Sequence, residues 1–156
     1  MSTVMADTYP DLYAAAGIFA GCAYIRCWGL TDRAAYMAMG PRARPIPAYI
    51  VWGTNDSTNN YLVGRLQLLQ WLGTNELAEQ GPAVIPIPQL PTSVEFHPAN
   101  ADNHAFVVEH YSDRRNCAQV DFTSVIGMGH LPDTKGPKIV QAMTDFLLAH
   151  PISNGC

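Results

Sequence analysis

The chain has 156 residues, enough for a substantial hydrophobic core, and residues 1–156 are predicted to form a single domain. Apolar residues make up 48% of the chain and charged residues only 14%, a low proportion that favours a well-buried or extracellular protein. The net charge of −4 without a basic stripe argues against nucleic-acid binding, and the lack of an 18-residue apolar run argues against a membrane span.

The first third of the chain is predicted to contain one helix and one strand. Apolar spacing predicts a short helix over residues 2–8, which ends before Pro10. The small apolar run 14–24 predicts a buried strand. Residues 25–47 contain Gly-Pro and Pro-Ile-Pro breakers and are expected to be irregular.

The middle of the chain is predicted to contain a buried strand followed by an amphipathic helix. The continuous apolar run 48–53 is typical of a strand that is buried on both faces. A polar loop follows, and the apolar positions from Tyr61 to Leu72 predict a helix that Gly73 ends. Residues 81–98 hold five prolines, so they are expected to form a loop with at most a short edge strand.

The last third is predicted to contain a hairpin and a final helix. Runs 104–112 and 117–127 predict two strands around a turn at residues 113–116. The last helix is expected to begin near Pro137 and to end before Pro151. Strands that alternate with amphipathic helices predict an α/β fold, with a mostly parallel sheet flanked by helices.

The four cysteines favour disulfide chemistry over metal binding. Cys22 and Cys27 are five positions apart, without a histidine at metal-ligand spacing, so no metal site and no cofactor are predicted. A disulfide among Cys22, Cys27 and Cys117 is expected if the protein is secreted, but the sequence leaves the pairing open. Cys156 is terminal and is expected to be free or disordered.

Two predicted strand ends carry residues suited to acid–base chemistry. Asp56 follows the strand 48–53, and His130 follows the strand that ends in "SVIGMGH". A lone histidine there is more often structural. Functional groups of open α/β sheets, however, lie just beyond the carboxyl ends of strands. If the strands are neighbours, Asp56 fixes the tautomer of His130, whose other nitrogen accepts a proton from a nucleophile.

The remaining histidines lack partners at a recognisable spacing and are interpreted as structural or surface residues: His97, His104, His110 and His150. Asp102 is a reserve candidate for the acid, because its loop precedes a strand instead of following one.

Four residues are weak candidates for a nucleophile. Ser2 and Thr3 are expected in the first turn of a helix, and Ser57 is expected to cap the helix that starts near Asn59. For Cys22 a disulfide or a buried thiol is favoured over a nucleophilic role.

The three tryptophans, Trp28, Trp52 and Trp71, are candidates to line a cleft for an aromatic ester or a polymer chain. For Trp71, which lies on the predicted helix, packing is the favoured interpretation.

The segments "YPDLYAAAGIFAG", "YIVWGTNDST" and "VIGMGHLPD" together resemble the C-terminal half of an α/β-hydrolase. They are most similar to the secreted esterases that include polyhydroxybutyrate depolymerases, feruloyl esterases and acetylxylan esterases. The resemblance implies that Asp56 is the catalytic acid and His130 the base of a Ser-His-Asp triad. It also implies a plant-wall ester or polyester substrate. Trp52 departs from the pattern, because many members have histidine there.

The same resemblance leaves the nucleophile unaccounted for, since the chain contains no Gly-x-Ser-x-Gly elbow. It places the elbow and the N-terminal strands before Met1. We therefore expect a partial α/β-hydrolase fold that pairs with a second copy or with a missing N-terminal half. The alternative is a catalytically inactive hydrolase fragment that oligomerises or binds ligand without turnover. The family implies secretion or a periplasmic location, although residues 1–10 show no signal-peptide features.

Overall fold

The computed structural model describes residues 1–84, 89–133 and 136–152. Its elements follow the order helix, strand, helix, strand, helix, three strands and helix, with one 3-10 turn. They are α1 (Ser2–Thr8), β1 (Ala16–Phe19), α2 (Asp32–Met39), η1 (Gly40–Arg42), β2 (Ala48–Gly53), α3 (Tyr61–Gln80), β3 (Ser93–His97), β4 (Phe106–Ser112), β5 (Ala118–Val125) and α4 (Pro137–Ala149).

The five strands form one sheet in the order β1-β2-β5-β4-β3. β1, β2 and β5 are parallel, whereas β4 runs antiparallel to both β5 and β3. The α/β class is therefore confirmed, but the sheet is mixed and the expectation of a mostly parallel sheet is not. The reason is local: the short turn between β4 and β5 permits only an antiparallel pair, because a parallel pair needs a long crossover.

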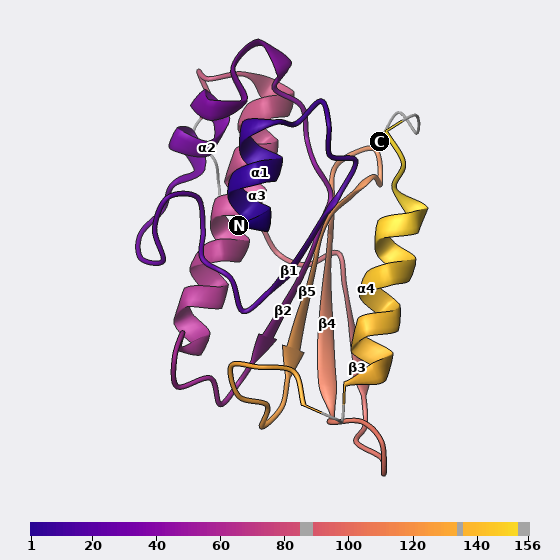
Figure 1. The fold of residues 1–156 in the computed structure, drawn as a ribbon. Coiled ribbons are helices and arrows are strands. Elements are labelled where there is room, and N and C mark those ends of the chain that lie inside the picture. The colour runs from indigo at the N-terminus through magenta and orange to yellow at the C-terminus, as the bar shows by residue number, and fades with distance from the viewer. Residues whose placement is uncertain (85–88, 134–135, 153–156) are drawn as a thin grey trace.

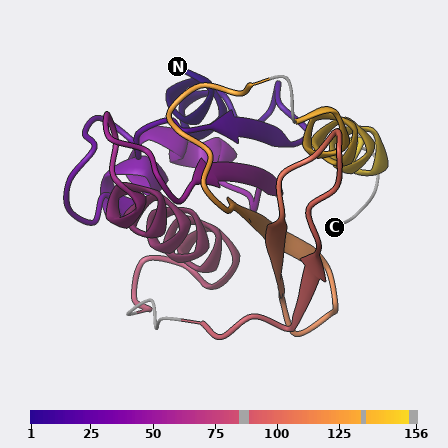
Figure 2. The same cartoon turned by 90° about the horizontal axis from the view of Figure 1, so that it is seen from below.

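Helices cover both faces of this sheet, as Figures 1 and 2 show. α1, α2 and α3 lie on one face, where Trp71, Leu68 and Phe122 contribute to the larger core cluster. α4 lies alone on the other face, over a smaller cluster that includes Tyr49, Val51 and Phe146. Since both faces are covered, all six residues of β2 are buried, as their continuous apolar run predicts.

Two helices differ from the prediction. α3 continues past Gly73 to Gln80, and a Cβ at Gly73 would lie 2.9 Å from the carboxylate of Asp32. Gly73 therefore lets α2 approach α3 closely and does not end the helix. α2 itself lies within the segment expected to be irregular; it has eight residues and buries only Ala35 and Met39, which is too weak an apolar pattern to predict a helix.

The strand β1 is shorter than the apolar run that predicts it. Ala20 has a φ of 45° and ends the strand, and the Cys22–Cys27 disulfide closes the loop beyond it. The expectation of a disulfide among the first three cysteines is thus confirmed. Cys117 is disulfide-bonded as well. The prediction that Cys156 is free concerns a residue outside the described ranges.

Asp7 is a buried carboxyl group in α1, and we expect it to lower stability at neutral pH. Burial raises the pKa of Asp7 to about 7, although a hydrogen bond from Gln70 partly offsets the shift. Because the unfolded chain loses this proton near pH 4, we expect the free energy of unfolding to fall between pH 4 and 7 and to stay low above. Asp7→Asn should raise it by about 2 kcal/mol at pH 8 in urea titrations.

The matched control for this prediction is Asp11→Asn, because Asp11 forms an exposed ion pair with Arg42. That variant should change stability by less than about 1 kcal/mol. Equal effects of the two substitutions at pH 8 would show that Asp7 is not destabilising.

Candidate functional site

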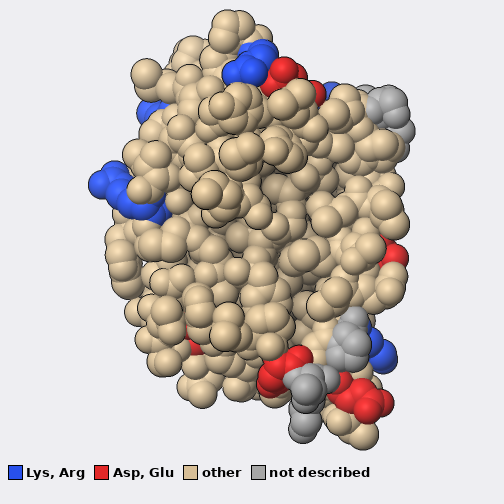
Figure 3. Space-filling model, viewed as in Figure 1, with Lys and Arg blue, Asp and Glu red and all other residues tan. Residues whose placement is uncertain are grey.

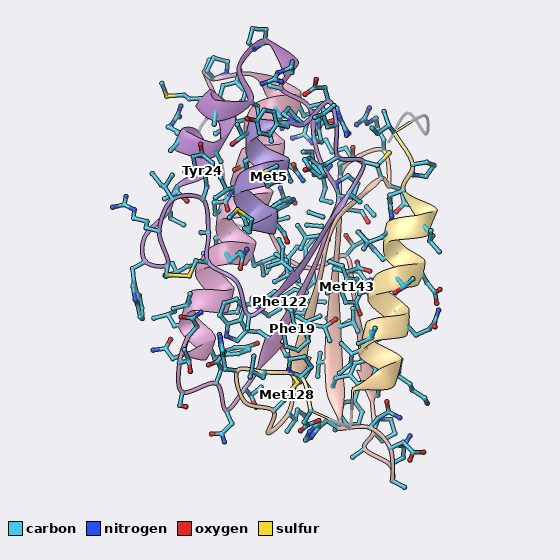
Figure 4. All side chains as sticks on the ribbon, in the orientation of Figure 1. Met5, Phe19, Tyr24, Phe122, Met128 and Met143 are labelled. Carbon is cyan, nitrogen blue, oxygen red and sulfur yellow. A yellow bond between two sulfur atoms is a disulfide. The ribbon has the colours of Figure 1, made fainter. Side chains whose placement is uncertain are left out.

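The loops after β2 and β5 are hydrogen-bonded to each other where they leave the sheet. The parallel pairing of the two strands ends at Gly53 and Val125. Beyond it, the backbone N–H of Thr54 donates to the carbonyl of Val125 at 2.9 Å. The N–H of Asn55 donates to the carbonyl of Met128 at 3.0 Å. Figure 4 shows Met128 at the end of the sheet where these two loops meet. The loops that carry Asp56 and His130 are thus joined to each other by backbone hydrogen bonds.

Asp56 is fixed in place by three hydrogen bonds and its side chain is fully buried. Its Oδ1 accepts the backbone N–H groups of Thr58 at 2.9 Å and of Asn59 at 2.8 Å, and its Oδ2 lies 2.9 Å from Nδ1 of His130. Burial raises the pKa of Asp56, but the hydrogen bonds from His130 and from these two amides outweigh it, so the pKa lies below its ordinary value. Asp56 is therefore a carboxylate at neutral pH.

His130 is oriented by this carboxylate. An ionised carboxylate only accepts hydrogen bonds, so Nδ1 of His130 carries the proton that it donates to Asp56. In the neutral ring Nε2 is then a free acceptor. Within the part of the chain that the structure describes, no group is hydrogen-bonded to Nε2, and the side chain is 32% exposed. The ring is thus held by one nitrogen and available for proton transfer at the other.

Gly53 is the residue that allows the two loops to meet. A Cβ at this position would collide with the backbone carbonyl oxygens of Met128 and Gly129. Gly127 has a φ of 78°, which favours glycine, whereas a Cβ at Gly129 would meet no atom within 4 Å. Only one of the two glycines before His130 is therefore needed for the turn.

Asn59 is a further residue of the site, and sequence reasoning gave it no role. Besides donating its backbone N–H to Asp56, it accepts the indole N–H of Trp52 on its carbonyl at 2.9 Å. Its side-chain amide donates to the carbonyl of Ala20 at 3.1 Å, at the end of β1. Asn59 thus ties the Asp56 loop to two neighbouring strands. Its position three residues after the acid was the only signal in the sequence.

The other titratable candidates lie elsewhere. His104 pairs with Asp133 and His110 with Asp121, each at 2.8 Å, so both have partners that the sequence did not indicate. Asp102, the reserve acid, lies in an exposed turn and its backbone N–H donates to Asn100.

Among the described residues, the structure does not place a candidate nucleophile beside the Asp56–His130 pair. Cys22 is bonded to Cys27, which confirms the favoured interpretation of Cys22. Thr3 is buried and accepts a hydrogen bond from Gln67. Ser57 is exposed, but Asn60 and not Ser57 caps α3. None of these residues is hydrogen-bonded to His130 in the described part of the chain.

The tryptophans do not form a common cleft. Trp52 and Trp71 are buried in the larger core cluster, and Trp28 alone is exposed. Packing is therefore confirmed for Trp71, and the cleft-lining prediction is wrong for Trp52. Trp52 packs against Gly64, and its indole N–H donates to the carbonyl of Asn59. It therefore stabilises the loop that carries Asp56.

The described residues hold neither a metal-binding cluster nor a membrane-spanning helix. No group of three or more His, Cys, Asp or Glu side chains there is placed to hold a metal ion. No helix there is long and apolar enough to span a bilayer. The face shown in Figure 3 carries only scattered basic side chains, mainly near its upper and left margins.

The geometry defines a carboxylate–imidazole pair at the carboxyl ends of two adjacent parallel strands in an α/β protein. Comparison with known proteins adds no family to this description. No protein-family model matches the chain, and a search of curated proteins finds no significant match.

Proposed function

We propose that the chain provides the acid and the base of a carboxylic ester hydrolase of the α/β-hydrolase type. The observation that carries this proposal is the hydrogen bond between the buried Asp56 carboxylate and Nδ1 of His130, with Nε2 left available. In this scheme Nε2 accepts the proton of a serine hydroxyl as the serine attacks the ester carbonyl. The imidazolium then protonates the departing alcohol, and water repeats the sequence on the acyl-enzyme.

The serine of this scheme is not among the residues hydrogen-bonded to His130. The sequence resemblance places it on a segment upstream of Met1, so the proposal takes it from a chain segment that pairs with this one. The same resemblance favours plant-wall esters or polyesters as substrates, and a secreted or periplasmic protein. The Cys22–Cys27 disulfide supports that location, because disulfides persist in oxidising compartments.

The test is hydrolysis of p-nitrophenyl acetate by the chain together with the serine-bearing segment, in parallel with mass spectrometry of the chain alone after treatment with a fluorophosphonate. We expect His130→Ala to abolish the hydrolysis above background, because the general base is lost. His104→Ala is the matched control, since His104 also pairs with an aspartate at 2.8 Å and should leave the rate unchanged.

The outcomes separate the two candidate functions. A rate that is the same in wild type and in His130→Ala contradicts the assignment of the base. A fluorophosphonate adduct locates a serine within these residues, which peptide mapping identifies. If the chain forms no adduct and hydrolysis is absent even with the serine-bearing segment present, the result supports the alternative, an inactive hydrolase fragment that oligomerises or binds ligand.

A further inference from the structure

β3 forms one outer edge of the sheet, and within the described ranges no strand pairs with its outer side. Figure 2 shows β3 at the end of the sheet opposite to β1. Four of its five residues are exposed and the fifth is half-buried. A strand edge of this kind presents unpaired backbone N–H and C=O groups that can accept a further strand.

The two faces of β3 carry different chemistry. Val94 and Phe96 are apolar but 58% and 63% exposed. Glu95 and His97 lie on the opposite face, because side chains alternate along a strand. The five-residue strand therefore presents an exposed apolar pair on one side and an acid–imidazole pair on the other.

The acid–imidazole pair is already oriented. The ring of His97 stacks on Phe106, with centroids 4.3 Å apart and planes at 13°. One carboxylate oxygen of Glu95 lies 3.4 Å from Nε2 of His97, and the other lies 3.8 Å from Nε2 of His110. The His97 ring is thus packed against Phe106 within the chain itself, before any partner binds.

We propose that the occupant of this edge is β3 of a second copy, paired antiparallel about a two-fold axis at Phe96. In that register Phe96 lies opposite Phe96 of the partner subunit, which buries the exposed aromatic rings against each other. Glu95 lies opposite His97 of the partner subunit, and the symmetry axis repeats this pair. The edge is thus complementary to its own reversed copy in both polar and apolar character.

Charge selects this register over its neighbour. With the axis at Glu95, the two glutamates would face each other directly, which is destabilising. With the axis one residue further along, at Phe96, the Glu95 carboxylate of each copy lies opposite the His97 imidazole of the other. Pairing at this edge does not depend on the proposed hydrolase, because Asp56 and His130 follow β2 and β5 in the interior of the sheet.

The test is the oligomeric state of the full chain by sedimentation velocity over a wide range of concentration. We expect a dimer for the wild type and loss of that dimer in Phe96→Lys. The matched control is Val140→Lys, which changes an equally exposed apolar residue on α4 and should leave the dimer intact. Because both positions are exposed, both variants should keep the wild-type circular dichroism spectrum.

A second measurement tests the register. Phe96→Cys should form a disulfide-linked dimer under mild oxidation, because residue 96 faces its own copy across the axis. Val94→Cys should not, since residue 94 faces Pro98 of the partner subunit. A monomer at all concentrations overturns the proposal. So does a dimer that survives Phe96→Lys, which would point to the other sheet edge at β1, and so does cross-linking through residue 94 instead of 96.

Discussion

A Gly53→Ala variant is expected to lose about 3 kcal/mol of stability and to separate Asp56 from His130. The added Cβ would collide with two backbone carbonyl oxygens, those of Met128 and Gly129. Backbone atoms in a hydrogen-bonded loop cannot move aside as a flexible side chain can. The loop that carries His130 must therefore shift as a unit away from the acid loop.

Urea unfolding measures the loss of stability, and the ring N–H resonance of His130 reports the hydrogen bond to Asp56. Gly129→Ala is the control, because its Cβ would meet nothing within 4 Å and should change stability by less than about 0.5 kcal/mol. If Gly53→Ala is as stable as Gly129→Ala, the close contact between the two loops is not present in solution.

Asp56→Asn is expected to lower ester hydrolysis about 10⁴-fold while the fold is kept, provided that the proposed hydrolase is correct. The asparagine amide can donate to Nδ1 of His130, so the ring proton moves to Nε2. A protonated Nε2 cannot accept a proton from a nucleophile, and the base is lost although His130 stays in place. The kcat of the serine-containing enzyme, compared with that of His130→Ala, measures this loss.

The same substitution changes the response of stability to acid. The pKa of Asp56 is lower in the folded chain than in the unfolded one, so its contribution is present at neutral pH. It is lost as the pH falls below about 4, through the folded-state pKa. Asp56→Asn should remove this part of the acid-induced loss of stability. A variant with unchanged hydrolysis, or with an unchanged acid response, would contradict the role given to Asp56.

The elements that a single local pattern specifies were predictable from the sequence. The run 48–53 is apolar throughout and forms β2 over these residues. The short helix before Pro10 and the helix that begins at Pro137 also follow the prediction. In each case one proline or one apolar run decides the structure. Asp56 follows the end of β2 at Gly53, and His130 follows the end of β5 at Val125, as the predicted strands 48–53 and 117–127 imply.

The features that depend on distant contacts were not predictable in the same way. Gly73 resembles a helix terminator, but the contact with Asp32 from another helix explains it. Asn59 has no local signal for its bond to Ala20, which lies 39 positions earlier. The mixed sheet is a different case, because the predicted hairpin of strands 104–112 and 117–127 already implies an antiparallel pair.

The adjacency of β2 and β5 also has a consequence for folding kinetics. Asp56 and His130 are separated by 74 positions, and α3, β3 and β4 lie between their strands. Closing so long a loop lowers the chain entropy before the contacts between the strands can stabilise the chain. Parallel pairing of this kind is therefore slow. Asp56 lies in the loop after β2 and His130 in the loop after β5, so we expect the hydrogen bond between them to form only when these strands pair. In a refolding experiment the ring N–H signal of His130 would therefore mark completion of the central sheet, after the local helices and the β4–β5 hairpin have formed.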